Sequence, residues 1–296
     1  MTGTTLFFVA DGPHLEAQAL LLAASLRRHL GAAPALIAYV PDRPDREMPA
    51  ATRAALAHLN VAVEPLRVPR DLWQKPFPHG NKILAACAPR RASVHVFLDT
   101  DMVCVAPLDL DALSRPGALS AVPEGVPGWG KGNDRWDRVY GHFGLPLPED
   151  RVRLTRRRRV SYLPYFNAGL LAWHDGFGAG GRPWPELWRD TAVEIDWNVR
   201  VAKKRPWLDQ IALPVALRRH GLAYRVLPDR VNFSISDRAF EPAARPALIH
   251  YHSFRYTPEW PQVADETAAM AAALGPHLGA MEALYDGVWH GQEAGR

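Results

Sequence analysis

Cysteine is almost absent from this chain, which has only Cys87 and Cys104 among its 296 residues. Two cysteines cannot build a disulfide framework, a cysteine-rich zinc site or a Cys-x-x-Cys redox motif. We therefore expect both to be reduced core residues of a protein that works in the reducing cytoplasm.

Long apolar runs and a leader pattern are also lacking. The longest apolar run, residues 19–24, is far shorter than a membrane span and lies in a segment that carries Glu16, Arg27 and Arg28. Residues 1–10 contain no basic stretch and no cleavage site typical of secretory signal peptides. The sequence thus predicts a cytoplasmic protein and leaves peripheral membrane contact open.

Lysine is scarce, because only five of the 35 basic residues are lysines, and the net charge is just +4. Such a small excess does not indicate a nucleic-acid partner. Arginine is suited to fixed two-point contacts with phosphate or carboxylate groups. We interpret the arginine run 156–159 either as a solvated loop or as a clamp for an anionic acceptor or lipid head groups.

Hydrophobic residues make up 48% of the chain, enough for a large core. Apolar segments at 4–10, 35–40, 61–66 and 94–98 predict strands, and they alternate with helical patterns at 15–30, 49–59 and 81–88. This alternation predicts an α/β fold with a mainly parallel sheet and helices on both faces.

The second half of the sequence is less regular. Residues 123–164 are rich in Gly, Pro, Trp and Arg, which predicts a functional insertion or lid. Strands are then predicted at 166–173, 222–227 and 247–251, with a helix at 208–218. An alanine-rich helical tail begins at 262 and is interrupted at Pro276.

Two carboxylates, Asp99 and Asp101, directly follow the predicted strand 94–98. Ligands of such sheets bind beyond the carboxyl ends of the strands. The i, i+2 spacing lets both acids reach one hard cation, such as Mg²⁺ or Mn²⁺. The alternative is a pair of solvated acids in a loop. The apolar residues on both sides, including Met102, favour the metal site.

The segment from Phe97 to Val103 resembles the DxD motif of nucleotide-sugar glycosyltransferases with the GT-A fold. It most resembles the family that contains glycogenin and the bacterial lipopolysaccharide galactosyl- and glucosyltransferases. Five further segments, at 8–11, 79–84, 166–171, 207–213 and 248–252, occur in the order of that family. The resemblance implies one GT-A domain over 1–296, with a nucleotide-binding half (1–122), the insertion (123–164), a sugar and acceptor half (165–261) and a helical tail (262–296).

On the donor side, the resemblance implies that Val9, Ala10 and Asp11 end the first strand at the uracil or ribose. A turn-forming role beside the following glycine is the alternative for Asp11. Where the family usually has an aromatic residue, this chain has His14.

Further donor contacts are implied for Lys82, Asp99, Thr100 and Asp101. Lys82 lies on an apolar helix 17 positions before Asp99, where the family carries a basic residue that reaches the donor sugar or phosphates. The alternative is a surface lysine whose stem covers apolar residues.

At the sugar, the resemblance implies contacts from Asn167, Asp209 and Gln210. An asparagine and a glycine, Gly169, inside an apolar strand need hydrogen-bond partners or a close approach. Asp209 and Gln210 would lie beside the anomeric carbon. Asp209 could alternatively be a helix N-cap.

The family completes its metal site with a histidine, and His250 matches it. An imidazole beside Asp99 and Asp101 favours Mn²⁺ over Mg²⁺. His252 is then expected to contact a phosphate or to support the metal ligands from behind. The family's glycine and Lys-Pro-Trp segment are missing, and we expect Arg255 or His252 to substitute for that lysine.

The resemblance therefore implies a metal-dependent hexosyltransferase that uses a UDP-sugar or another nucleotide-diphosphate sugar. The acceptor would be a hydroxyl of a saccharide, glycolipid or other compound, and the configuration would be retained. Two alternatives stay open: a haloacid-dehalogenase-type phosphatase, and a non-catalytic nucleotide-sugar-binding module. The position of Asp99 after three strands argues against the phosphatase, whose motif normally opens its domain.

Overall fold

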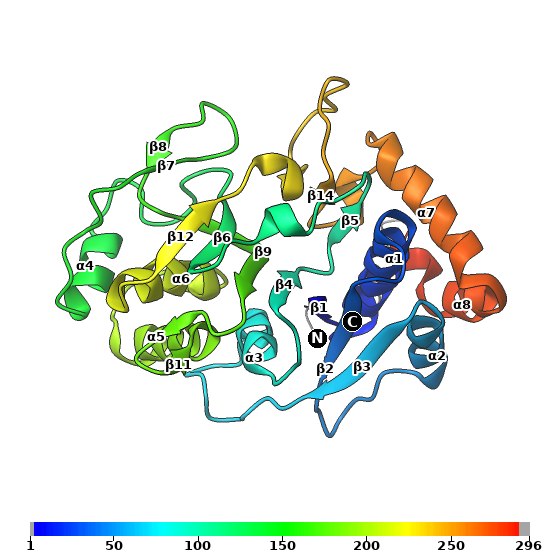
Figure 1. Ribbon diagram of the computed structural model, residues 1–296, viewed down its shortest axis with the longest axis horizontal. Coiled ribbons are helices and arrows are strands. Elements are labelled where there is room, and N and C mark those ends of the chain that lie inside the picture. Colours follow the sequence, from blue (N-terminus) through cyan, green and yellow to red (C-terminus); the bar gives the residue numbers. More distant parts are fainter. Residues whose placement is uncertain (1–2, 290–296) are drawn as a thin grey trace.

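The computed structural model describes residues 3–289. Its centre is a seven-stranded sheet of order β12-β6-β9-β4-β1-β2-β3 (Figure 1). The strands are β1 (Thr4–Val9), β2 (Ala35–Pro41), β3 (Val61–Leu66), β4 (Val94–Leu98), β6 (Ala118–Pro123), β9 (Phe166–His174) and β12 (Ala223–Val226). Neighbours are parallel except at β9, which runs antiparallel to both β4 and β6. The predicted α/β fold with a mainly parallel sheet is confirmed.

Helices cover both faces of this sheet. They are α1 (Pro13–Leu30), α2 (Ala50–His58), α3 (Asn81–Cys87), α4 (Arg135–His142), α5 (Trp184–Asn198), α6 (Leu208–Arg219), α7 (Pro261–Leu274) and α8 (Leu278–Trp289). Leu6 and Phe8 of β1 point into the core under α1, α2, α7 and α8. Phe7 and Val9 alternate with them and point into the core under α3, α4, α5 and α6.

A small second sheet joins two distant parts of the chain. It contains β5 (Met102–Cys104), β14 (Leu248–His250) and β13 (Phe233–Ser234). β5 and β14 are antiparallel, with Met102 opposite His250, and the amide of Tyr251 donates to the carbonyl oxygen of Asp101 at 2.9 Å. This pairing brings the segment of the two aspartates to the segment of the two histidines.

Several elements differ from the sequence prediction. Helix α5 was not predicted, although Trp184, Trp188 and Ile195 are buried on it at helical spacing. The proline-rich start of this segment conceals the pattern, yet a proline in the first turn costs no hydrogen bond. The segment 123–164 is less irregular than predicted, because it contains α4 and a hairpin of β7 (Val152–Arg153) and β8 (Ser161–Tyr162).

The remaining predictions concern the tail, the cysteines and the membrane. The tail consists of α7 and α8, separated by a 3₁₀ turn at Gly275–His277, and its residues 290–296 lie outside the described part. Both cysteines are free, with Cys104 buried and Cys87 half-buried. Within residues 3–289, none of the helices combines the length and apolar character needed to cross a bilayer.

Candidate active site

The predicted site residues meet in a cavity of about 540 Å³. It lies beyond the carboxyl ends of β1 and β4, where parallel strands present their ligand-binding edge. The predicted residues that line it are Val9, Asp11, Lys82, Asp99, Thr100, Asp101, Asn167, Asp209, Gln210, His250 and His252. Ala10 is the exception, because its side chain is fully buried in the core.

Asp99, Asp101 and His250 form the floor of this cavity. Each offers one ligand atom, and these atoms lie within 4.8 Å of one another. His250 is 3% exposed, whereas Asp99 and Asp101 are 24% and 22% exposed, so the carboxylates are open to the cavity and the imidazole is held from behind. Two carboxylates and one imidazole suit a divalent cation such as Mn²⁺, and the residues present therefore fit the expected ion.

Opposite charges dominate the electrostatics of this cluster. Burial opposes charge on Asp101, but the neighbouring His250 outweighs it and lowers the pKa of the carboxyl well below its usual range. Burial also opposes charge on His250, yet Asp101 and Asp99 together raise its pKa. The pKa of Asp99 is raised by burial and by Asp101, against the pull of Lys82.

A partner behind His250 sets the direction of its ring. Nδ1 of His250 lies 2.8 Å from Oδ1 of Asn232, while Nε2 lies 3.1 Å from Oδ1 of Asp101. The amide nitrogen of Asn232 donates to Oδ1 of Asn167 at 2.8 Å, which leaves the Asn232 oxygen to accept from His250. Nε2 is thereby the nitrogen turned toward the carboxylates.

The same chain of hydrogen bonds continues to Asn167 and Gln210, two of the residues predicted to contact the sugar. Asn167 donates to Oε2 of Glu124 at 3.2 Å, and its oxygen also accepts from the amide of Gly169 at 2.9 Å. Gln210, with its amide nitrogen as donor, bonds the same Glu124 oxygen at 2.7 Å. A Cβ at Gly169 would lie 2.6 Å from Cε1 of His250, so only glycine fits this close approach.

Glu124 and Asn232 are members of the site that sequence reasoning missed. Glu124 follows β6 directly and lines the cavity. Burial raises its pKa, while bonds from the Gly125 amide and from Asn167 act in the opposite direction. An acid that directly follows a strand could have identified Glu124. Strand 118–123 is not predicted from the sequence, so this signal is missing.

Lys82 lies between two carboxylates. Its Nζ is 2.9 Å from Asp99 and 3.3 Å from Asp209, and the side chain is only 10% exposed. Burial opposes its charge, but Asp99 and Asp209 raise its pKa above the usual value. The alternative of a surface lysine is therefore wrong. The N-cap alternative for Asp209 is also wrong, because Trp207 occupies that position.

At the end of β1, Asp11 accepts hydrogen bonds from Arg43 at 2.6 Å and from Asn81 at 3.3 Å. These bonds fix the position of its carboxylate in the cavity lining. Thr100 is buried and donates to Gln18 at 3.2 Å. His14 lies edge-on against Phe254.

His252 also lines the cavity and stacks on His250 with ring centroids 3.8 Å apart. Burial, together with the charge of His250, lowers the pKa of His252 to about 3. Its Nδ1 lies 2.6 Å from Oγ of Ser236. Arg255 bonds the hydroxyl of Tyr256, so of the two residues expected to replace the family's lysine, His252 is the one that lines the cavity.

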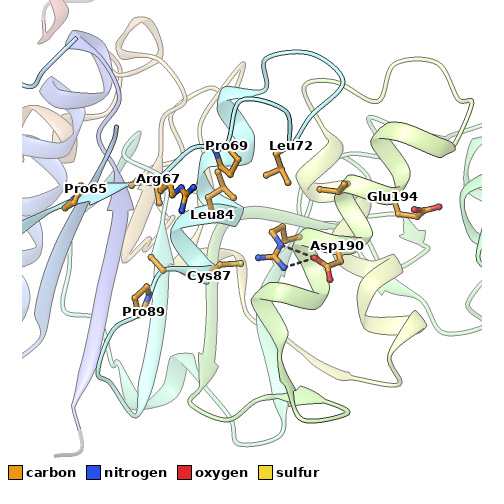
Figure 2. A pocket seen from close by; sticks show the side chains of 13 residues that line it. Pro65, Arg67, Pro69, Leu72, Leu84, Cys87, Pro89, Asp190 and Glu194 are labelled. Atoms are coloured by element: carbon orange, nitrogen blue, oxygen red, sulfur yellow. Dashed lines mark hydrogen bonds and ion pairs between the residues drawn. The ribbon is translucent and has the colours of Figure 1, made fainter. Parts of the chain in front are cut away.

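A second cavity, of about 670 Å³, lies between β3, α3 and α5 (Figure 2). Leu72, Leu84 and Cys87 surround it, and Asp190 at its wall already pairs with Arg189 at 2.9 Å. Burial raises the pKa of Cys87 to about 12, which keeps it as an unreactive thiol. This cavity therefore lacks the convergent reactive groups of the first.

Comparison with solved structures places the fold. The galactosyltransferase LgtC in complex with donor and acceptor sugar analogs is similar with a TM-score of 0.57 and 15% identity, over 90% of this chain and 95% of that chain. Mouse xyloside xylosyltransferase 1 gives a TM-score of 0.54 and 14% identity, over 84% and 98%. GlyE of Streptococcus pneumoniae TIGR4 gives 0.54 and 16%, over 95% and 64%. These likenesses show the GT-A glycosyltransferase fold.

The family follows from the sequence itself. The model of the Rhodobacterales glycosyltransferase domain matches residues 6–221, and the chain belongs to this family. No curated protein matches the chain. The protein is a glycosyltransferase with the GT-A fold, as the motifs predicted, and the family replaces the phosphatase and binding-module alternatives.

Proposed function

We propose that this protein transfers a hexose from a nucleotide-diphosphate sugar, a UDP-sugar, to a hydroxyl of a saccharide, glycolipid or other acceptor. The reaction depends on Mn²⁺ or Mg²⁺ and retains the configuration. One observation carries the proposal: Asp99, Asp101 and His250 converge on the floor of the cavity that Lys82 and Asp209 also line. We further propose that residues 1–296 act as one glycosyltransferase domain.

Asp99, Asp101 and His250 are the residues that would hold the ion. When bound, the ion offsets the negative charge that develops on the departing nucleoside diphosphate. Asn232 keeps Nε2 of His250 directed at the carboxylates. Lys82 supplies a second, fixed positive charge on the cavity side of Asp99.

The nucleoside end of the donor is assigned to the end of β1. Val9 and Asp11 line the cavity there, and the Ala10 amide donates to Tyr39 at 2.9 Å, which fixes the backbone of this segment. Thr100 lies between the two aspartates. His252, which is neutral and lies beside the metal ligands, is placed to contact a diphosphate oxygen.

The sugar is assigned to Asn167, Asp209 and Gln210, with Gln210 beside the anomeric carbon. In the transfer, the bond from that carbon to the diphosphate oxygen breaks and a bond to the acceptor oxygen forms on the same face. The acceptor proton goes to the departing diphosphate oxygen. Two cavity carboxylates are already engaged, Asp209 by Lys82 and Glu124 by its three donors, which supports this route over a protein base.

The test is thermal stabilisation by UDP and GDP, each with and without Mn²⁺. We expect the nucleotide and ion together to raise the melting temperature of the natural protein, and Asp101→Ala to abolish the rise. Asp45→Ala, which removes an exposed acid, serves as the control. The proposal fails if neither nucleotide with Mn²⁺ shifts the melting temperature, or if the shift survives in Asp101→Ala. Hydrolysis of the UDP-sugar in the presence of Mn²⁺ then tests whether this nucleotide sugar is the donor.

A further inference from the structure

The arginine run 156–159 is joined to the rim of the candidate active site. The amide of Thr155 donates to the carbonyl of Glu124 at 3.1 Å, and the amide of Arg156 donates to that of Gly125 at 3.0 Å. A bond of 3.0 Å from the Arg159 amide to the Arg156 carbonyl closes the turn. This turn at the tip of the β7–β8 hairpin is called the arginine turn below. Because it is tied to Glu124, its position relative to the cavity is fixed.

Arg156 carries a charge that the protein leaves largely uncompensated. Its side chain is half-buried and lies across Gly125, where a Cβ would come within 2.8 Å of Arg156 Cδ. The one hydrogen bond of its guanidinium within residues 3–289 is long, 3.4 Å to Oγ of Ser234, and the same residues provide the guanidinium with no ion pair. Of the five donors of a guanidinium, most are thus free for a ligand.

Four neighbouring charged groups act on Arg156. Burial lowers its pKa, and Arg238 and Arg157 lower it further, whereas Asp237 and Glu124 act against them. Arg238 is already occupied, because it bonds Glu241 at 2.8 Å and lies over the ring of Phe233 at 3.8 Å. The positive charge that lacks an ion-pair partner is therefore that of the arginine turn and not that of Arg238.

The other three arginines of the arginine turn also differ in whether an acid compensates their charge. Arg159 lies 3.6 Å from Asp229, whereas Arg157 and Arg158 are exposed and form no ion pair with any residue in 3–289. Arg157 and Arg159 have φ angles of 54° and 46°, in the left-handed region that favours glycine. Strained backbone of this kind clusters at active sites and ligand-binding segments, where the surrounding structure holds it in place. The charge of Arg157 lies close enough to Arg156 to act on its pKa.

We infer that Arg156, with Arg157 beside it, binds an anionic group of the acceptor, a carboxylate or a phosphate on a sugar. The inference rests on the proposed function and names the acceptor class. Topology favours the acceptor over the nucleoside end of the donor. Asp11 follows β1 and Glu124 follows β6, and β4 and β9 lie between these strands, so the arginine turn is attached to the cavity at the end away from Asp11. A half-buried, positioned guanidinium suits a defined anion better than a lipid surface.

The experiment measures binding of three sugars by calorimetry in the presence of saturating UDP and Mn²⁺. The probes are glucose 6-phosphate, methyl β-D-glucuronide and methyl β-D-glucoside, which separate phosphate, carboxylate and neutral chemistry. We expect at least one anionic probe to bind about tenfold or more tightly than the neutral one, as one charge-assisted pair allows. Arg156→Ala should remove this preference, and Arg156→Lys should keep only part of it. Arg53→Ala, an exposed arginine on α2, should leave it unchanged.

Other outcomes overturn the inference. It is wrong if the neutral and anionic sugars show no difference, including no binding, or if Arg156→Ala keeps the preference while its melting temperature is unchanged. It is also wrong if Arg156→Ala weakens the binding of UDP with Mn²⁺, since the arginine would then serve the donor. The inference is also wrong if the protein binds phosphatidylglycerol vesicles through Arg156 and shows no preference among the three sugars. The arginine turn would then be a membrane-binding segment. Failure of UDP and Mn²⁺ to bind the natural protein refutes the proposed function instead.

Discussion

Asn232 accepts a hydrogen bond of 2.8 Å from Nδ1 of His250 and so determines which nitrogen of that ring faces Asp101. Asn232 directly precedes β13 and His250 ends β14, and these two strands pair in parallel. Asn232 is 4% exposed and also donates to Asn167. One asparagine therefore links the proposed metal site to the proposed sugar site.

Replacing Asn232 by alanine should weaken metal binding without removing a ligand. The His250 ring would lose the partner that fixes its orientation, and loss of such a partner typically costs about 10–100-fold in metal affinity. Titration of Mn²⁺ in the presence of UDP measures this. Asn198→Ala, at the exposed end of α5, is the control. Unchanged Mn²⁺ affinity in Asn232→Ala would refute the positioning role.

Replacing Lys82 by methionine should destabilise the fold. The buried Asp209 and the partly exposed Asp99 would lose their cation, and breaking a fully buried ion pair typically costs about 3–5 kcal/mol, which is the upper limit here. Urea unfolding monitored by tryptophan fluorescence gives the free energy of unfolding. Lys131→Met, at an exposed position, should have little effect. Equal stability of the two variants would show that Lys82 is not the counter-ion of this pair.

Replacing Gly169 by alanine should impair activity and stability together. The new methyl group would lie 2.6 Å from His250 and 2.8 Å from Asn167, and overpacking typically costs about 1–3 kcal/mol. Gly141→Ala, in α4 with nothing within 4 Å of the new atom, should be neutral or stabilising by up to about 1 kcal/mol. Donor hydrolysis and melting temperature are the two measurements. A fully active Gly169→Ala enzyme would contradict the close packing described.

Much of the site could be predicted because its residues follow strongly patterned strands. Asp99 and Asp101 come after an apolar five-residue strand, and His250 after another apolar run. Glu124 and Asn232 could not be found in this way. β13 has only two residues, and the role of Asn232 depends on a ring that is 18 positions away in the chain.

The elements of the fold also divide into those that the sequence predicts and those that it does not. The strands β1 to β4 are apolar and separated by clear helices, so their alternation is visible in the sequence. β5 has three residues and is stabilised by pairing with β14, so its local sequence carries little signal. Trp207 also lines the cavity and could not be singled out from the sequence, because its exposure depends on how α6 begins beside the cavity.

Alkylation of Cys87 should be slow and should increase with pH. Burial raises the pKa of this thiol to about 12, so about one molecule in ten thousand carries the reactive thiolate at pH 8. The rate with iodoacetamide, followed by mass spectrometry, should rise about tenfold per pH unit from 8 to 10. The folded state favours the protonated thiol, so this group's contribution to the free energy of unfolding declines as the pH rises above 9. A native rate equal to that in urea would contradict the burial.

Because Met102 pairs with His250, the proposed metal site forms only when β5 and β14 are in the correct register. Successive side chains of a strand point to opposite faces, so a slip of one residue between β5 and β14 would turn the imidazole away from Asp101. A chain that misaligns these short strands during folding would then lack a divalent-ion site. Ion binding would select for the correctly aligned molecule and would draw misaligned chains toward it by mass action.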